Sequence, residues 1–150
     1  GSSGLNGESN FTYNGTTINL SSGSNYTAIH FYISSTLNGS ITVFPGGTSY
    51  NTSSDYRLKE NVTYNFDATT RLKKLKPARF NFIADADKTV DGFLAHEVSE
   101  VVPEAITGEK DAVDSDGKII PQGIDQSKLV PLLVKTIQEL EARIAVLESK

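Results

Sequence analysis

Charged side chains are divided unevenly along this chain, and the division lies at Ser54. The first 54 residues are rich in Gly, Ser, Thr and Asn, and their one Asp, Glu, Lys or Arg residue is Glu8. From Asp55 onward the chain carries all 14 Lys and Arg residues and 17 of the 18 acidic residues. At 150 residues the length suits one domain, or a small domain with an appendage. We therefore expect an α+β protein in two parts, residues 5–54 and residues 55–150.

The first part has the residue alternation of short β-strands. Residues 11–20 predict a hairpin that turns at Asn14 and Gly15, a strong two-residue turn signal. Two further strands are expected over residues 28–33 and 40–44, with a second Asn-Gly turn at residues 38–39 between them. Their apolar faces are too narrow to offset the entropy lost on ordering one chain. We expect this segment to fold where strands of other chains complete its core, as in an intertwined trimeric fibre; a small independent sandwich is the alternative.

The middle of the chain predicts a mixture of helices and strands. Asp67 can cap a helix that passes through Leu72 and Leu75 to Lys76 and ends before Pro77. The other elements expected here are a strand over residues 79–83, a polar turn over 85–88, an apolar strand over 92–95, a short helix over 97–101 and a hairpin around 114–118.

The last 25 residues give the clearest secondary-structure prediction. Six apolar residues fall at the a and d positions of a coiled coil over nearly three heptads. This a/d seam consists of Val130, Ile137 and Ile144 at a and of Leu133, Leu140 and Leu147 at d. We expect a helix over about residues 126–149, with Pro131 in its first turns, where a missing N–H matters least. Ile at a with Leu at d favours two strands by the coiled-coil rule.

Ser54 and Lys59 are the one candidate pair of a nucleophile with a nearby base. A serine hydroxyl needs such a base, and a lysine acts as one after its ammonium loses a proton, which desolvation or a neighbouring cation favours. Arg57 is a candidate for that cation, and it can equally bind Asp55. Taken alone, the pair also fits a surface serine followed by a solvated lysine.

The residues around this pair resemble the opening of a known domain. The order Ser-Asp-x-Arg-Leu-Lys-x-Asn-Val over residues 54–62 is similar to the start of the peptidase S74 domain, the C-terminal intramolecular chaperone of phage tailspikes, tail fibres and endosialidases. Residues 72–82, residues 92–98 with 102–105, and the closing helix over 129–147 are similar to later blocks of that family. The resemblance runs in order through residues 54–150.

The resemblance implies an intramolecular chaperone that forms a homotrimer, templates an upstream β-fibre segment of its own polypeptide, and then releases itself. Ser54 would be the nucleophile and Lys59 the general base of a Ser-Lys dyad that cuts its own chain once. Arg57 and Asn61 are candidates for supporting residues, and no cofactor is implied. The parent would be the precursor of a phage tail fibre or spike, folded in the host cytoplasm, that loses its chaperone part on maturation.

Two peptide bonds are candidates for the cut. The family is described as cutting at this serine, which implies the bond between Ser54 and Asp55. A serine that attacks its own carbonyl would close a four-membered ring, whereas attack on the carbonyl of Ser53 closes a five-membered ring and gives an ester. Either the Ser53–Ser54 bond breaks, or Ser54 acts on another chain or through a helper group.

Several other classes of function are disfavoured. A net charge of −4 without a basic run argues against a nucleic-acid partner, and no apolar run approaches a membrane span. The absence of cysteine rules out disulfides and thiolate zinc sites. We expect no metal, because adjacent His96 and Glu97 point in different directions and because the Asp-rich residues 114–117 lack the register of a calcium loop.

Two alternatives to a self-cleaving chaperone remain. In the first, the domain is a permanent trimeric fibre tip or adhesin in which Ser54 and Lys59 are inert. In the second, the β segment binds a cell-surface glycan through exposed aromatic residues such as Tyr26 and Tyr32.

Overall fold

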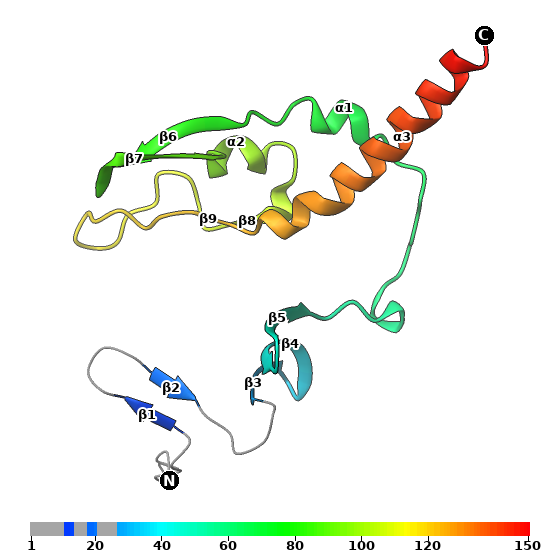
Figure 1. Ribbon diagram of the computed structural model, residues 1–150. Coiled ribbons are helices and arrows are strands. Elements are labelled where there is room, and N and C mark those ends of the chain that lie inside the picture. Colours follow the sequence, from blue (N-terminus) through cyan, green and yellow to red (C-terminus); the bar gives the residue numbers. More distant parts are fainter. Residues whose placement is uncertain (1–10, 14–17, 21–26) are drawn as a thin grey trace. The chain divides into compact units, whose positions relative to one another are not determined.

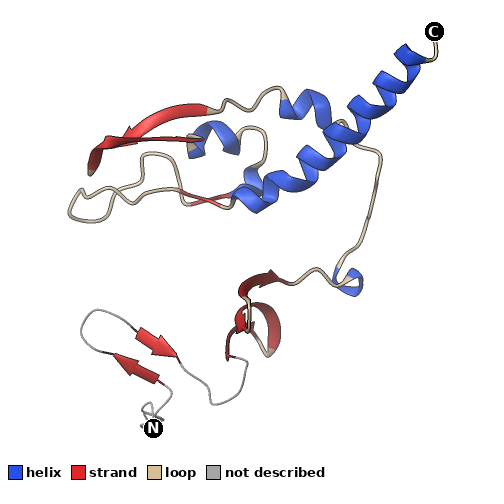
Figure 2. Cartoon of the chain, viewed as in Figure 1, coloured by secondary structure: helices blue, strands red, loops and turns tan. Residues whose placement is uncertain are grey.

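The computed structural model describes residues 11–13, 18–20 and 27–150. The chain divides into two compact units, one up to Val62 and one from Thr63 to Lys150. In the described residues, strands dominate the first unit and the α-helices lie in the second (Figures 1 and 2). Strands and helices are thus both present, as the predicted α+β class requires.

The first unit begins with the predicted hairpin. Strands β1 (Phe11–Tyr13) and β2 (Ile18–Leu20) pair antiparallel, with Phe11 opposite Leu20. The turn residues Asn14 and Gly15 lie outside the described residues, as does Tyr26.

A three-stranded antiparallel sheet follows, and one of its turns differs from the prediction. Strands β3 (Thr27–Ile33), β4 (Thr36–Phe44) and β5 (Gly47–Thr52) are neighbours in that order. The turn predicted at Asn38 and Gly39 is wrong, because both residues lie inside β4 and the chain turns at Ser34 and Ser35, which have φ of 46° and 70°. A Cβ on Gly39 would lie 2.7 Å from the carbonyl oxygen of Asn51 in β5. Close strand approach therefore explains this glycine.

One face of the three-stranded sheet is apolar and uncovered. Alternation and register place on it Ile29, Phe31, Ile41, Val43 and Tyr50. Phe31 is 52% exposed and Tyr50 is 78% exposed. Thr42 is the one buried side chain among those described in this unit. The sheet therefore has no apolar core of its own in the described residues.

The second unit combines short helices, two-stranded antiparallel sheets and a long C-terminal helix (Figure 1). Its elements are α1 (Ala68–Leu72), β6 (Ala78–Phe82), β7 (Asp85–Gly92), α2 (Ala95–Ser99), β8 (Ile106–Thr107), β9 (Gly123–Ile124) and α3 (Val130–Glu148), with short 3-10 turns at Pro103–Ala105 and Gln126–Leu129. Strand β6 pairs with β7, and β8 pairs with β9. The predicted C-terminal helix is present, and its helical residues run from Gln126 to Glu148.

Several local predictions for this unit need correction. Asp67 does cap α1 by accepting from the N–H of Thr70, but the helix ends at Leu72, not at Lys76. Residues 85–88 belong to β7 and are not a turn, because β6 and β7 are joined directly through Ile83 and Ala84. Of the strand predicted over residues 92–95, only Gly92 lies in a strand, as the last residue of β7, and α2 begins at Ala95, two residues before the predicted helix. The turn predicted around residues 114–118 is present, closed by the Asp114 N–H on the carbonyl of Lys118.

The hydrophobic core of the second unit lies where α3 meets α1, α2 and the turn after α2. Its buried members are Ala68, Val98, Val102, Ala105, Leu129 and Leu132. In α3 the buried residues are Leu132 and Thr136, while the six residues of the a/d seam are between 43% and 67% exposed. Helix α3 therefore packs on its own domain through a different face and leaves the seam uncovered.

Candidate active site at Ser54 and Lys59

Ser54 is the single residue between the end of the sheet and a tight turn. The N–H of Ser53 donates to the carbonyl of Asn38 at 2.9 Å, which extends the pairing of β4 and β5 by one residue. Asp55 is already the N-cap of the 3-10 turn η1 (Tyr56–Leu58). Both candidate cleavage bonds thus lie at the junction between the sheet and this turn.

Asp55 and Arg57 hold the turn in shape. The Asp55 carboxylate accepts from the backbone N–H of Arg57 at 2.9 Å, from its Nε at 2.9 Å and from its Nη2 at 2.7 Å. The side chain of Arg57, followed by its backbone N–H, lowers the pKa of Asp55, and the carboxylate raises the pKa of Arg57 in return. An exposed ion pair adds little stability by itself, but three hydrogen bonds to one carboxylate restrict the conformation of the turn.

The turn brings Lys59 back to Ser54. The N–H of Leu58 donates to the carbonyl of Asp55 and that of Lys59 to the carbonyl of Tyr56, each at 3.1 Å. This reversal places Lys59 Nζ 2.7 Å from Ser54 Oγ, to which it donates a hydrogen bond. A separation of this size is what a general base needs to take the proton of a nucleophile.

The other candidate residues lie apart from this pair. The Arg57 side chain binds the Asp55 carboxylate, which is the second of the two roles predicted for it. Asn61 has a positive φ of 53°, and in the described residues its side chain forms no hydrogen bond with Ser54 or Lys59. No described N–H donates to the backbone carbonyls of Ser53 or Ser54. Ser54 and Lys59, the candidate nucleophile and base, are both exposed in the single chain.

The residues considered for metals have other contacts. Glu97 pairs with Lys76 at 3.1 Å, and the carbonyl of His96 accepts from the Ser99 hydroxyl. Asp114 Oδ1 accepts from the N–H groups of Asp116 and Lys118, so this carboxylate closes its own turn. Among the described residues no group of three or more His, Cys, Asp or Glu side chains could hold a metal ion. The described helices also include none that combines the length and apolar character needed to cross a membrane.

The sequence predicted that Arg57 could bind Asp55, but it did not predict that Asp55 caps the turn. Asp55 was considered as part of the scissile bond, whereas in the structure it caps the turn that carries Lys59. The signal was available, because Asp is among the preferred N-cap residues and a basic residue two positions later can bind its carboxylate.

Comparison with known protein families gives a match at the candidate site. Residues 54–107 match the family peptidase S74, described as the chaperone of endosialidase. The match begins at Ser54 and includes Lys59, the turn between them, α1, both β6 and β7, and α2. No curated protein matches the chain. Over residues 54–107 this chain is therefore similar to the peptidase S74 family, described as the chaperone of endosialidase.

Proposed function

We propose that this chain is an intramolecular chaperone that assembles as a homotrimer, templates the folding of its own upstream β segment, and then cuts itself once at Ser54. The observation that carries the proposal is the 2.7 Å contact between Lys59 Nζ and Ser54 Oγ. That contact lies where the sheet ends and where the peptidase S74 match begins.

The chemistry follows from the two side chains. The neutral amine of Lys59 accepts the hydroxyl proton of Ser54, and Oγ attacks a peptide carbonyl carbon. As the C–N bond breaks, the leaving amine takes the proton from the Lys59 ammonium, which leaves an ester on Ser54. Water then hydrolyses the ester to a carboxylate and restores the hydroxyl. Attack on the carbonyl of Ser53 within one chain gives fragments that meet between Ser53 and Ser54, and attack by Ser54 of another copy gives fragments that meet between Ser54 and Asp55.

Two uncovered surfaces support self-association. The three-stranded sheet leaves one apolar face without a cover, and α3 leaves its a/d seam without one. Apolar surfaces of this kind mark interaction sites in soluble proteins. Pairing of the seams would hold three β segments close together. A high effective concentration lowers the entropic cost of starting an interwoven sheet.

We propose that assembly also switches on the cut. Ser54 and Lys59 are exposed in the single chain, and water stabilises a charged ammonium. When neighbouring copies cover the junction, loss of water favours the neutral amine and their N–H groups can serve as oxyanion donors. Cleavage would then follow folding and would not precede it.

This order of events suits the precursor of a phage tail fibre or spike that folds in the host cytoplasm. After the chaperone part has left, an unfolded fibre has no template on which to refold. Its stability is then governed by the rate of unfolding and not by an equilibrium.

Refolding tests the chaperone function separately from the cut. Full-length chain with Ser54→Ala and a chain ending at Ser54 are diluted from denaturant at equal concentrations. The proposal predicts trimeric β structure from the full-length variant and aggregate or unstructured chain from the truncated one. Equal yields of folded trimer from both would contradict templating.

One observation favours the second candidate function, a permanent glycan-binding tip. Tyr32 is 58% exposed and lies edge-on to His30, with ring centroids 6.1 Å apart. Such a tip stays whole after folding, and Tyr32→Ala abolishes glycan binding without changing assembly. An intact wild-type trimer with that phenotype would favour this candidate over the chaperone.

A further inference from the structure

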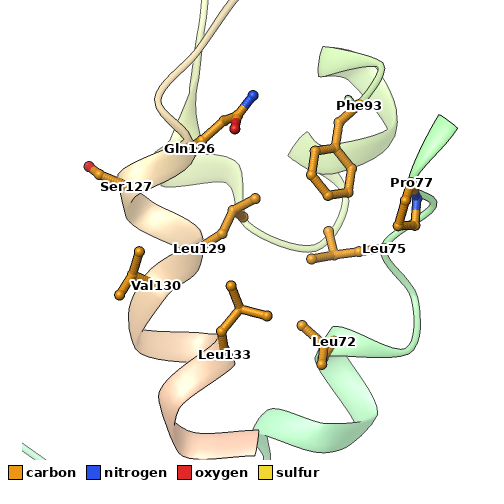
Figure 3. Close-up of a pocket in the computed structure, with 9 residues that line it drawn as sticks. All are labelled: Leu72, Leu75, Pro77, Phe93, Gln126, Ser127, Leu129, Val130 and Leu133. Carbon is orange, nitrogen blue, oxygen red and sulfur yellow. The ribbon is translucent and has the colours of Figure 1, made fainter. Parts of the chain in front are cut away.

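An apolar pocket lies at the start of α3, beside the a/d seam. It has a volume of about 600 Å³ and is bounded on one side by Leu129, Val130 and Leu133. Facing these across the pocket are Leu72, Leu75, Pro77 and Phe93, while Gln126 and Ser127 form its polar edge. Figure 3 shows Leu133 and Leu72 pointing toward one another across it. Part of the seam therefore forms a wall of this pocket.

Heptad positions identify a side chain that suits the pocket. With Val130 and Leu133 at a and d, Leu129 is the g residue of the preceding heptad and Val134 is an e residue. In a parallel coiled coil in register, a g residue lies beside the e residue of the next heptad on the neighbouring helix, five positions further along. Leu129 of one copy would then face Val134 of another. Val134 is 49% exposed in the single chain, so it is free to reach a neighbour.

We propose that this pocket is the docking site for Val134 of a second copy of this chain, in a parallel, in-register pairing of the α3 helices. The inference rests on the self-association proposed above and specifies its contacts. In a trimer each copy offers its pocket to one neighbour and its Val134 to the other. All three pockets are then filled, and each Val134 is removed from water.

The other end of α3 supports the same register through charge. Position g there is Arg143, and the e residue five positions later is Glu148. Both side chains are exposed, and in the described structure neither forms a salt bridge within its own chain. Parallel pairing in register places Arg143 of one copy beside Glu148 of the next. The same spacing thus joins two apolar residues at the pocket and two opposite charges at the far end.

The pocket is tested by an acidic substitution and a matched control. Sedimentation equilibrium is measured on the full chain with Ser54→Ala, alone and with either Val134→Asp or Val146→Asp. Val146 is 59% exposed on the same helix and lies off the a/d seam and the flanking e and g positions. Because Val134→Asp buries an unpaired carboxylate, the concentration for half-assembly should rise at least about tenfold. Val146→Asp should leave it within about twofold.

Charge exchange tests the register independently of the pocket. Arg143→Glu and Glu148→Arg should each weaken assembly by roughly two- to fivefold, and the double variant should restore it. Circular dichroism of every variant checks that α3 still forms, since all four substituted positions, Val134, Arg143, Val146 and Glu148, are exposed. A double variant no better than the worse single variant would overturn the parallel register.

The outcomes separate this inference from the proposed function. If the Ser54→Ala chain stays monomeric at all concentrations, self-association and the pocket assignment both fail. If it assembles and Val134→Asp behaves like Val146→Asp, only the pocket assignment fails. Assembly that Val134→Asp disrupts, with rescue by the charge exchange, supports both.

Discussion

The carboxylate of Glu139 in α3 accepts a hydrogen bond from the backbone N–H of Thr69 in α1 at 3.0 Å, and it also accepts from the Thr69 hydroxyl. Helix α1 has five residues, too few for stability in isolation. Glu139 thus supplies partners for the first turn of α1 from a residue 70 positions later. This contact ties the segment that follows the candidate active site to the helix that carries the a/d seam.

Glu139→Gln should lower the stability of the second unit in a pH-dependent way. The Thr69 hydroxyl, with the N–H groups of Thr69 and Ala68, lowers the pKa of Glu139. The stabilisation by Glu139 is therefore complete at pH values above the ordinary carboxyl pKa. It is lost as the pH falls through the lowered pKa of Glu139 in the folded state. Thermal melts should show wild type above the variant at pH 7, with the gap closing below about pH 4. Glu100→Gln, at an exposed residue, is the control. A difference in melting temperature between wild type and Glu139→Gln that does not change with pH would contradict this role of Glu139.

Arg57→Ala should slow self-cleavage by about ten- to 100-fold, because the turn that holds Lys59 near Ser54 loses its clamp. The rate is measured as first-order appearance of fragments on a denaturing gel. Arg79→Ala is a matched control, since Arg79 forms a similar exposed pair with Asp91 at 2.7 Å and 3.1 Å. Loss of the clamp should also follow protonation of Asp55 below its lowered pKa. Wild-type cleavage rates in Arg57→Ala would show that the clamp has no part in positioning Lys59.

Ile137→Asp should prevent both assembly and cleavage without unfolding the second unit. Ile137 is an exposed a residue, so the single chain loses no core contact, whereas a seam of three helices would have to bury three carboxylates. Light scattering gives the mass of the assembly, and mass spectrometry gives the extent of cleavage. Gln138→Asp places the same charge one residue away, outside the seam, and should behave as wild type. Complete cleavage in monomeric Ile137→Asp would show that cleavage does not require assembly, which would contradict the account.

Leu132 and Leu133 should have opposite roles although they are adjacent. Leu132 is 4% exposed in the core, so Leu132→Ala should cost about 2–5 kcal/mol of unfolding free energy. Leu133→Ala should cost less than about 1 kcal/mol in the single chain and should weaken assembly instead. Urea unfolding in the monomeric Ile137→Asp background measures the first effect, and sedimentation equilibrium measures the second. Equal unfolding costs would contradict the division between a core face and a seam face.

Features that depend on local residue patterns could be predicted from the sequence. The seven-residue repeat predicted the C-terminal helix, because it persists over nearly three heptads. The hairpin of β1 and β2 followed from alternation around a strong turn signal. The proximity of Ser54 and Lys59 depended on a short spacing that a single turn can close.

Features set by tertiary contacts could not be predicted in this way. Gly39 looks like a turn glycine, but its role depends on the carbonyl of Asn51 in the neighbouring strand β5, a contact that a local sequence pattern does not show. Strand β5 itself was missed because Gly47–Thr52 is polar apart from Tyr50. The core face of α3 was missed because Thr136 and Glu139 lie on it, and neither is apolar.

Intact-mass spectrometry of freshly folded wild type, beside Ser54→Ala and Lys59→Ala, tests the self-cleaving chaperone most directly. The account predicts two wild-type fragments that meet at Ser54 and an uncut chain in both variants. The fragment masses would also distinguish the Ser53–Ser54 bond from the Ser54–Asp55 bond. Wild-type protein that assembles as a trimer and stays whole would contradict the enzymatic claim and leave only the folding role.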